Sequence, residues 1–577
     1  MSPNSQSTPA RLTAPATVKL PRLMLFVLAF AYIVAGLFGR DPWKTDDVVG
    51  LATMLTAFNA QGHSWLLPHI GSFELTQDGP LVMWVGAAMI RIFGPMIGVI
   101  HAAQLATTLW FAMTLGFVWY GTYLLGRRAE AQPLALPFGG EPTVKDYGRL
   151  IADAASLLLI ATAGVLLRLH ETSFVPALIA CYSLGFYAMA RMLDKPLVGS
   201  TMLGIALAGA FLTRAWPGVL ALLFAIPIAF LPRGALWVRR FWLIWTLLLA
   251  IGLGMGWWLA GMHIDPDWMS EWMHWNRQAF GLPDSSVALR PFSDLPWFLW
   301  PIWPLAILAL WQWRRWMTAP HILIPASLVL GLFLLLPILS ESGEHEFVLL
   351  VAPMAVLASF ALPTMRRGVI NTLDWFALMC FSVTAVCAWI GWVALHFGIP
   401  HGIQLNIQRQ TAGFEPVLEW WRVIAAVFVT MIWVGMVIWR LRRHPSVLWR
   451  GAVLCAAGIT TTWLLLVLLW MPAVDYVRSY RPMSAQIKTV LDKISNNGGP
   501  NCVRAQGLSL GPQASLYVFD NINFTYDSSC PFVLQQTTRK QLENDTAGYS
   551  DGATVLWIGS RGADRFDRYR LLRVKNK

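Results

Sequence analysis

Two acidic groups near the start of the chain have residue types and spacing suited to catalysis. Asp46 and Asp47 follow the first apolar run, Leu20–Phe38, and open an amphipathic segment, Val48–Ala60. The positive end of a helix dipole holds such carboxylates ionised. Asp78 follows in the same polar segment. An ionised carboxylate can take a proton from an acceptor hydroxyl or orient a group that is already anionic. The alternative interpretation is that these acids are solvated loop charges.

More charged residues stand where other apolar runs begin or end, where charge is costly and tends to be functional. We expect four of them to line the same site: Glu171, Glu344, His345 and Glu346. The turn that holds His170 and Glu171 equally suits an interfacial cap. One histidine and one acid fall short of a metal ligand set, so we expect no metal site here. A need for a divalent metal cofactor is left open.

Three arginines are candidates for holding a phosphate, a task that suits the planar, always charged guanidinium. Arg214 ends a run that is otherwise wholly apolar, whereas Arg277 and Arg290 belong to a polar, Trp-rich stretch, 262–293. Arg214 could instead extend to lipid headgroups while its stem stays in the apolar layer.

The elements that must position these residues are membrane helices. The chain is 56% hydrophobic and only 13% charged, against roughly 25% charged in ordinary soluble chains. We predict thirteen spans. They lie near 20–38, 99–125, 148–167, 174–190, 199–213, 217–231, 241–261, 294–312, 321–340, 347–364, 371–398, 417–439 and 449–471. The short pair around Arg214 could also be one broken re-entrant unit.

The distribution of Lys and Arg predicts the orientation. Seventeen fall in the loops on the N-terminal side of the spans and seven in the short loops opposite, so the N-terminus is expected in the cytoplasm. The first run is long enough to span and lacks a cleavage site, so we expect no cleaved signal peptide. The net charge of +12 then faces anionic lipid headgroups, and we expect no nucleic-acid partner.

Two domains follow from this topology. Residues 1–472 form the membrane domain, whose first outer loop, 39–98, holds two short interfacial helices, Val48–Ala60 and Leu81–Phe93. Residues 473–577 form an outer α/β domain, for which we predict a helix at Met483–Lys493 and strands at Ser515–Phe519 and Ala553–Ile558.

Cys502 and Cys530 are the two cysteines of this outer domain. The periplasm is oxidising, so we expect a structural disulfide between them. Two buried thiols are the alternative. The other four cysteines lie within apolar spans and are expected to be buried thiols.

Several short motifs resemble the C-type glycosyltransferases (GT-C) of the protein O-mannosyltransferase and aminoarabinose lipid A transferase group. Together they extend over most of the chain. They are Trp43-x-x-Asp46-Asp47, Thr76–Leu81, Gly209–Arg214 with Pro217-Gly218, Pro296–Pro301, and Glu346-Phe347 with Pro353. The resemblance implies a polytopic helical fold of about thirteen spans with a C-terminal periplasmic α/β domain. It also implies that Asp46 is the acid nearest the reacting sugar and that Glu171 is a second acid.

One position departs from the pattern of the family. An acidic–basic Glu-Lys pair is common at the second loop motif, and in the aminoarabinose transferases its lysine is thought to contact the donor phosphate. Here the pair is Gln77-Asp78. An anion beside a phosphate repels it, so we expect Asp78 to face the sugar or the acceptor while Arg214 or Arg277 holds the phosphate.

The resemblance implies an enzyme of the bacterial inner membrane, expected to act as a monomer. It would transfer a sugar, such as 4-amino-4-deoxy-L-arabinose, from a polyprenyl phosphate to lipid A or another envelope glycolipid at the periplasmic face. Transfer to a protein hydroxyl is the alternative within the class. A polyprenyl-lipid flippase is less favoured because the polar groups are one-sided, whereas alternating access needs a site near the midplane. Thirteen spans are excessive for a scaffold that only anchors the outer domain.

Overall fold

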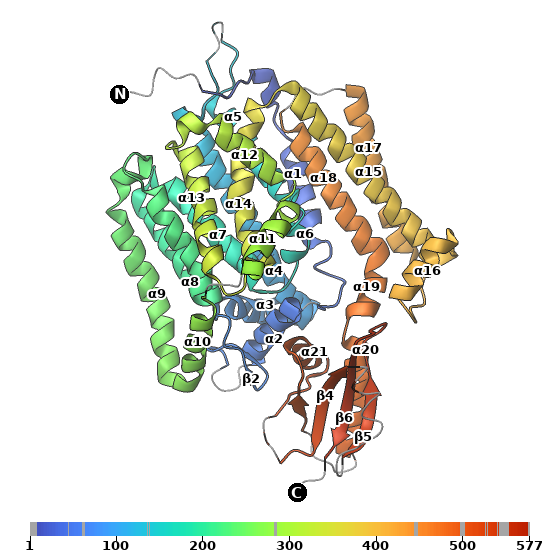
Figure 1. The fold of residues 1–577 in the computed structure, drawn as a ribbon. Coiled ribbons are helices and arrows are strands. Elements are labelled where there is room, and N and C mark those ends of the chain that lie inside the picture. The colour runs from blue at the N-terminus through green and yellow to red at the C-terminus, as the bar shows by residue number, and fades with distance from the viewer. Residues whose placement is uncertain are drawn as a thin grey trace.

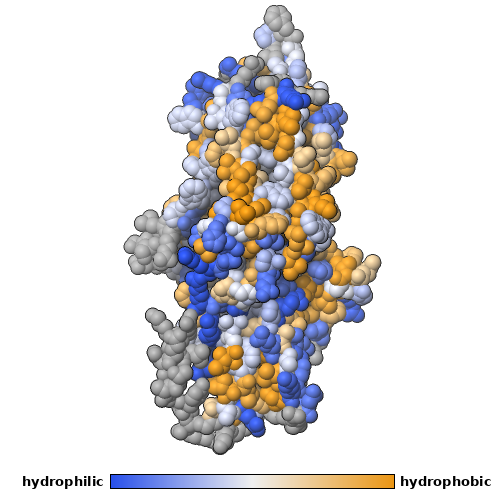
Figure 2. Space-filling model, turned by 90° about the vertical axis from the view of Figure 1, so that its right-hand side faces the viewer, coloured by the Kyte–Doolittle hydropathy of each residue, from blue (hydrophilic) through white to orange (hydrophobic). Residues whose placement is uncertain are grey.

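The computed structural model describes residues 8–43, 45–59, 64–135, 137, 139–281, 285–443, 448–496, 502–525, 527, 529–538, 541 and 553–574. A tall bundle of helices carries a small mixed domain at one end, and the N-terminus lies at the opposite end (Figure 1). Figure 2 shows apolar side chains over the flank of the bundle and hydrophilic ones gathered at its upper end. This distribution is typical of a protein that crosses a bilayer.

The bundle is formed in chain order by α1 to α18. Their bounds are α1 Arg22–Val34, α2 Thr45–Asn59, α3 Leu81–Ile97, α4 Val99–Gly126, α5 Val144–Ile160, α6 Val165–Arg168, α7 Phe174–Met192, α8 Pro196–Ala229, α9 Trp242–Ile264, α10 Pro266–Gln278, α11 Ser285–Phe298, α12 Ile302–Gln312, α13 Pro320–Leu335, α14 Glu344–Ala361, α15 Arg367–Phe397, α16 His401–Gln410, α17 Trp420–Arg443 and α18 Arg450–Leu465. A two-stranded hairpin, β1 (His69–Ile70) and β2 (Phe73–Glu74), follows α2.

Every predicted span coincides with a helix or a helical arm, but fewer helices are long enough to cross by themselves. Within the described residues, nine helices have the length and apolarity of a span, and a pair bent by 96°, Phe292–Phe298 with Ile302–Gln312, would make ten. α1 and α5 are short, at 13 and 17 residues. Thirteen crossings therefore stay a prediction.

α8 contains two of the predicted spans because the chain reverses inside it. Arg214 and Ala215 leave the helical conformation, with φ of −141° and +51°. A Cβ placed on Gly218 would lie 2.5 Å from the carbonyl oxygen of Ala210, whereas eight residues of straight helix extend about 12 Å. The two arms of α8 thus lie side by side, and the turn between them presents Arg214.

The loops predicted to be cytoplasmic meet at the end of the bundle that holds the N-terminus. The backbone N–H of Leu134 donates to Ala10, that of Arg11 to Pro363, and that of Leu448 to Ala16. Lys19 and Asp146 form an ion pair of 3.5 Å at the same end. These three loops therefore lie at one end of the molecule, next to residues 10–19. The orientation of that end stays a prediction.

The C-terminal domain is a four-stranded sheet with two helices. After α19 (Met471–Arg478) come α20 (Arg481–Asn496), β3 (Arg504–Gln506), α21 (Leu510–Asp520), β4 (Phe532–Thr538), β5 (Thr554–Gly559) and β6 (Asp567–Arg573). The strand order is β3-β4-β6-β5, with β3 parallel to β4 and the other pairs antiparallel. Ile487 of α20 and Leu516 of α21 pack on Leu534 and Leu571 of the sheet.

Two of the three elements predicted for this domain are present, and one prediction was wrong. α20 and β5 coincide with the predicted helix and strand, but Ser515–Phe519 belongs to α21. Its alternating β-branched and aromatic side chains favour a strand locally. In the fold they form two apolar contacts at once, with Leu516 on the sheet and Tyr517 against α2.

Cys502 and Cys530 are joined by a disulfide in this domain, which gives a test of orientation. In intact cells with a permeabilised outer membrane, we expect a membrane-impermeant thiol reagent to label this pair only after reduction. Cys181 and Cys455 are buried in the bundle, as expected, and provide an internal control. The expectation was wrong for Cys380 and Cys387, which are exposed on the apolar helix α15. Labelling without reduction would argue against the disulfide in the cell. Labelling that needs lysis of the inner membrane would reverse the orientation.

Candidate active site

The first turn of α2 carries Asp46 and Asp47 at the end of the bundle next to the C-terminal domain (Figure 1). α2 packs directly on the turn that precedes α7. A Cβ on Gly50 would lie 2.1 Å from the carbonyl oxygen of Thr172, so only glycine permits this approach. The backbone N–H of Thr172 in turn donates to Asp47 over 2.7 Å. The two acids are thereby fixed against the turn that contains Glu171.

Asp46 lies at the centre of a cluster of charges from three segments: α2, the turn that holds Arg168 and Glu171, and the start of α14. Its Oδ2 lies 2.7 Å from Nε2 of His345 and 3.1 Å from Nη1 of Arg168. The same Arg168 reaches Glu171 over 3.1 Å and Glu344 over 2.7 Å. We call these five residues the Asp46 cluster. It gathers acids that the sequence placed in three separate loops around one arginine.

The charges around Asp46 determine its protonation. Burial by itself would raise the pKa of Asp46, but the hydrogen bond and charge of His345, with Arg168 and Arg214, outweigh burial and lower the pKa to about 2. The carboxylate is therefore ionised at neutral pH. Its side chain is 30% exposed, so it remains accessible from the surface of the cluster.

Asp47 faces the opposite way and is buried. Its side chain is 1% exposed and its Oδ2 lies 2.7 Å from Nη1 of Arg40. Arg40 also donates to the carbonyl oxygen of His170 over 2.8 Å. This geometry fits an anchor for the first turn of α2 better than the catalytic role expected for Asp47.

His170 is also a buried residue of the fold. Its two ring nitrogens lie 2.7 Å from the carbonyl oxygens of Leu166 and Tyr32. Burial lowers the pKa of His170 to about 4, and the two carbonyl oxygens oppose this by favouring the protonated ring. No group of three or more His, Cys, Asp or Glu with the geometry of a metal site occurs among the described residues.

Asp78 and Arg214 form a second charged pair beside the Asp46 cluster. Arg214 donates to Asp78, and the segment of Asp78 rests on the turn of α8, where the N–H of Gly79 donates to Thr213 over 3.0 Å. Burial raises the pKa of Asp78 although Arg214 lies beside it. Phe174 links the two groups of charges: its ring centroid lies 4.1 Å from the Arg214 guanidinium carbon and 5.3 Å from the centroid of His345.

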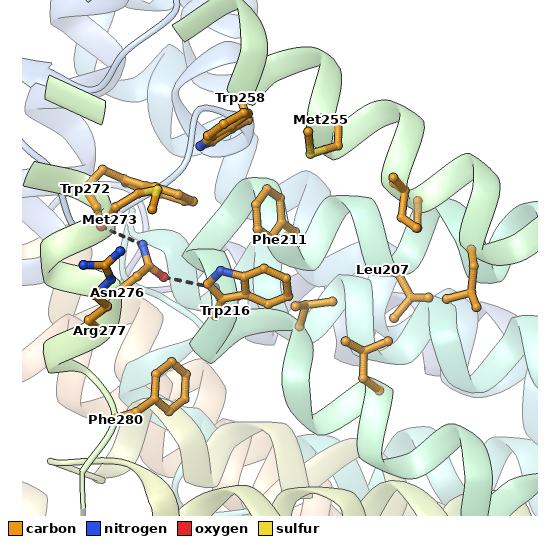
Figure 3. A pocket seen from close by; sticks show the side chains of 16 residues that line it. Leu207, Phe211, Trp216, Met255, Trp258, Trp272, Met273, Asn276, Arg277 and Phe280 are labelled. Atoms are coloured by element: carbon orange, nitrogen blue, oxygen red, sulfur yellow. Dashed lines mark hydrogen bonds between the residues drawn. The ribbon is translucent and has the colours of Figure 1, made fainter. Parts of the chain in front are cut away.

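An apolar cavity of about 650 Å³ lies between the arms of α8, α9 and α10. Figure 3 shows Leu207 and Met255 along its length and Arg277 with Asn276 at one end. Asn276 accepts from the N–H of Trp216 over 3.2 Å. Trp216 follows the Arg214 turn by two residues, so this polar end of the cavity adjoins the Asp78–Arg214 pair.

Some of the remaining predicted site residues belong to the Asp46 cluster and others do not. We expected Glu346 to line the same site as Glu344 and His345. Instead, its carboxylate accepts from the N–H of Gly343 over 2.8 Å and caps its own helix, α14. Arg290 belongs to α11, but its side chain lies outside the described part of the chain. Glu344, His345 and Glu171 all belong to the Asp46 cluster.

Sequence reasoning missed the residues that connect the acids. Arg168 and Arg40 were counted as loop charges, and Phe174 was part of an apolar run. A signal for Arg168 exists in the sequence, because it stands three residues before Glu171 in a short turn and can share one helical face with it. The rings of Phe174 and Trp275 both lie against the guanidinium of Arg214, and no sequence spacing indicates these contacts.

Comparison with solved structures agrees with this architecture. The crystal structure of ArnT from Cupriavidus metallidurans bound to undecaprenyl phosphate matches with a TM-score of 0.66 at 14% identity, covering 95% of this chain and 97% of that chain. The chain has the GT-C fold. The apo structure of the same ArnT matches with a TM-score of 0.63 at 15% identity and equal coverage. The GT-C fold predicted from the short motifs is thus confirmed, while no protein-family model and no curated protein sequence matches.

Proposed function

We propose that this protein is a glycosyltransferase of the bacterial inner membrane that moves a sugar from a polyprenyl phosphate to an acceptor at the periplasmic face. One observation carries the proposal. The apolar cavity ends at Arg277 and Asn276, next to the Asp78–Arg214 pair and the Asp46 cluster. A long apolar channel that ends in cations and carboxylates matches an amphiphile with a phosphate head and a sugar beyond it.

The donor fits the cavity in two parts. The polyprenyl tail packs among Leu207, Phe211 and Met255, and Arg277 pairs with the phosphate. Arg214 already has a carboxylate partner in Asp78, which leaves Arg277 as the better phosphate ligand. The ArnT structure with the same fold holds undecaprenyl phosphate, and this supports the donor class. Asp78 then faces the sugar, as its charge predicts.

The state of Asp46 favours one of the two chemical roles left open by the sequence. A general base works best with a pKa near the working pH, and a pKa of about 2 is far below it. Asp46 therefore orients the reactants and stabilises the positive charge that develops on the sugar. Transfer breaks the bond from the anomeric carbon to the phosphate oxygen and forms one to an acceptor oxygen. With an acceptor that is already anionic, no proton has to be removed.

This argument supports a phosphorylated lipid such as lipid A as the acceptor, and 4-amino-4-deoxy-L-arabinose or a related sugar as the group transferred. The amine of such a sugar would pair with Asp78, whose carboxylate adjoins the cavity end. Transfer to a protein hydroxyl remains the second candidate, because the GT-C fold is also that of the protein O-mannosyltransferase group the motifs resemble.

Reconstitution tests the proposal. In proteoliposomes that contain a polyprenyl-phosphate-linked labelled sugar and lipid A, we expect label to appear on lipid A, with spent polyprenyl phosphate released in equal amount. Label on an added protein instead would establish the second candidate. Movement of the labelled lipid across the bilayer without transfer to either acceptor would identify a flippase and contradict the proposal.

A further inference from the structure

The C-terminal domain is attached to the membrane bundle through two neighbouring residues of opposite charge. Asp41 accepts three hydrogen bonds from Arg481 at the start of α20, over 2.6, 2.9 and 3.1 Å, and a fourth from Ser479 over 2.8 Å. Arg40, the preceding residue, pairs with Asp47 of α2. The dipeptide thus joins the outer domain on one side to the first turn of α2 on the other.

A second contact continues along the length of α2. Val48 and Ala52 of α2 pack against Ala514 and Tyr517 of α21 in a core of their own. A Cβ on Gly511, at the start of α21, would lie 3.1 Å from Oγ1 of Thr45, the first residue of α2. Arg481 also contacts α21, because its guanidinium carbon lies 4.6 Å from the ring centroid of Phe519.

The disulfide restrains the segment that forms this contact. Cys502 and Cys530 stand two residues before β3 and β4, and α21 lies between these two parallel strands in the sequence. Joining the two ends of a segment limits the conformations open to what lies between them. The disulfide therefore limits the conformations of the segment that carries α21.

We propose that the C-terminal domain is a positioning element for the reaction centre: through Arg481 and α21 it holds α2 so that Asp46 stays in contact with His345 and Arg168. The inference rests on the proposed function in treating Asp46 as the carboxylate that stabilises the reacting sugar. Asp46 stands one residue from the Thr45–Gly511 contact and five from Asp41. Catalytic groups need positions accurate to about 0.5 Å, so loss of this docking displaces Asp46 without removing it.

The test compares two arginines of the same domain. Arg481→Gln removes the pair with Asp41, and Arg561→Gln removes a pair of the same 2.6 Å length, with Asp564, that lies inside the domain. In the full-length reconstituted protein we expect Arg481→Gln to lower kcat about 10- to 100-fold with little change in KM for the donor. Amide hydrogen exchange in Thr45–Asn59 should rise. Arg561→Gln should leave kcat and the amide hydrogen exchange of Thr45–Asn59 near the wild-type values.

A double-mutant cycle separates positioning from a general loss of stability. Asp41→Asn should reproduce the effect of Arg481→Gln, and the double variant should lose little more, because both remove one interaction. The double variant Cys502→Ser/Cys530→Ser lacks the disulfide and is an independent test. Amide hydrogen exchange in α2 should rise in it as well. Additive losses in the cycle, or an unchanged exchange of α2 in Arg481→Gln, would overturn the proposal.

The two proposals fail in different ways. If Asp46→Asn is inactive while Arg481→Gln keeps the wild-type kcat and exchange, the positioning role is wrong and the glycosyltransferase stands. If the wild-type protein transfers no sugar, the proposed function is wrong, and the exchange of α2 still decides whether the domain holds that helix.

Discussion

Asp46→Asn is expected to lower the rate of sugar transfer by about 10²–10³-fold, the range for loss of one group that stabilises charge in the transition state. The change removes a charge with almost no change in shape, so expression and donor binding should persist. The measurement is single-turnover transfer from the labelled donor in proteoliposomes. Since the pKa of Asp46 is about 2, its carboxylate should stay ionised between pH 5 and pH 8.

The neighbouring acid provides the control. Asp47→Asn leaves Arg40 buried without its partner, and breaking a buried ion pair typically costs about 3–5 kcal/mol. We therefore expect it to lower the midpoint of thermal unfolding more than Asp46→Asn does, with a smaller loss of rate. Retention of more than about a tenth of the wild-type rate by Asp46→Asn would contradict the role given to this residue, given the usual size of such effects.

Arg277→Gln is expected to weaken donor binding by about 10- to 100-fold, because a hydrogen bond to a charged group contributes about 1.5–3 kcal/mol. Binding of undecaprenyl phosphate to the purified protein can be followed through tryptophan fluorescence, since Trp216, Trp258 and Trp272 line the cavity. Arg422→Gln is a matched control. Arg422 also lies beside a tryptophan, Trp421. Its guanidinium forms an ion pair with Glu419, three residues earlier in the chain.

Two other results would place the phosphate elsewhere. Unchanged binding in Arg277→Gln together with lost binding in Arg214→Gln would assign the phosphate to the turn of α8. Asp78→Lys adds a second cation beside Arg214 and is expected to lower transfer of the native sugar. Tighter binding of undecaprenyl phosphate by Asp78→Lys without loss of transfer would place the phosphate beside Asp78.

The helices could be predicted from the sequence because a membrane span is a local property. Long apolar runs such as 99–125 and 449–471 form helices wherever they lie, since unpaired backbone groups are too costly in lipid. The turn at Arg214 was also visible, as a charge between two short runs. The secondary structure of Ser515–Phe519 could not be predicted locally. The segment has a local preference for a strand but is helical in the fold, where it contacts α2 and the sheet.

The site was predictable by residue type but not by partner. Asp46 and His345 are 299 residues apart in sequence and 2.7 Å apart in the fold, and no spacing rule relates them. Asp46 and Asp47 have nearly the same sequence context, yet one faces the charged cluster and the other is buried on Arg40. The direction of a side chain in the first turn of a helix depends on how that helix is docked, and this is a tertiary property.

The cavity between α8, α9 and α10 also bears on how the reaction is supplied. In the proposed function, its lining of apolar side chains with one arginine binds the tail and the phosphate of the donor, and the carrier keeps both features after the sugar has left. The spent carrier is therefore a competitor for the loaded one, in the same place and with similar contacts. The rate of sugar transfer then depends on the ratio of sugar-loaded to spent carrier in the membrane. Rapid removal of the spent carrier by other proteins would therefore increase that rate.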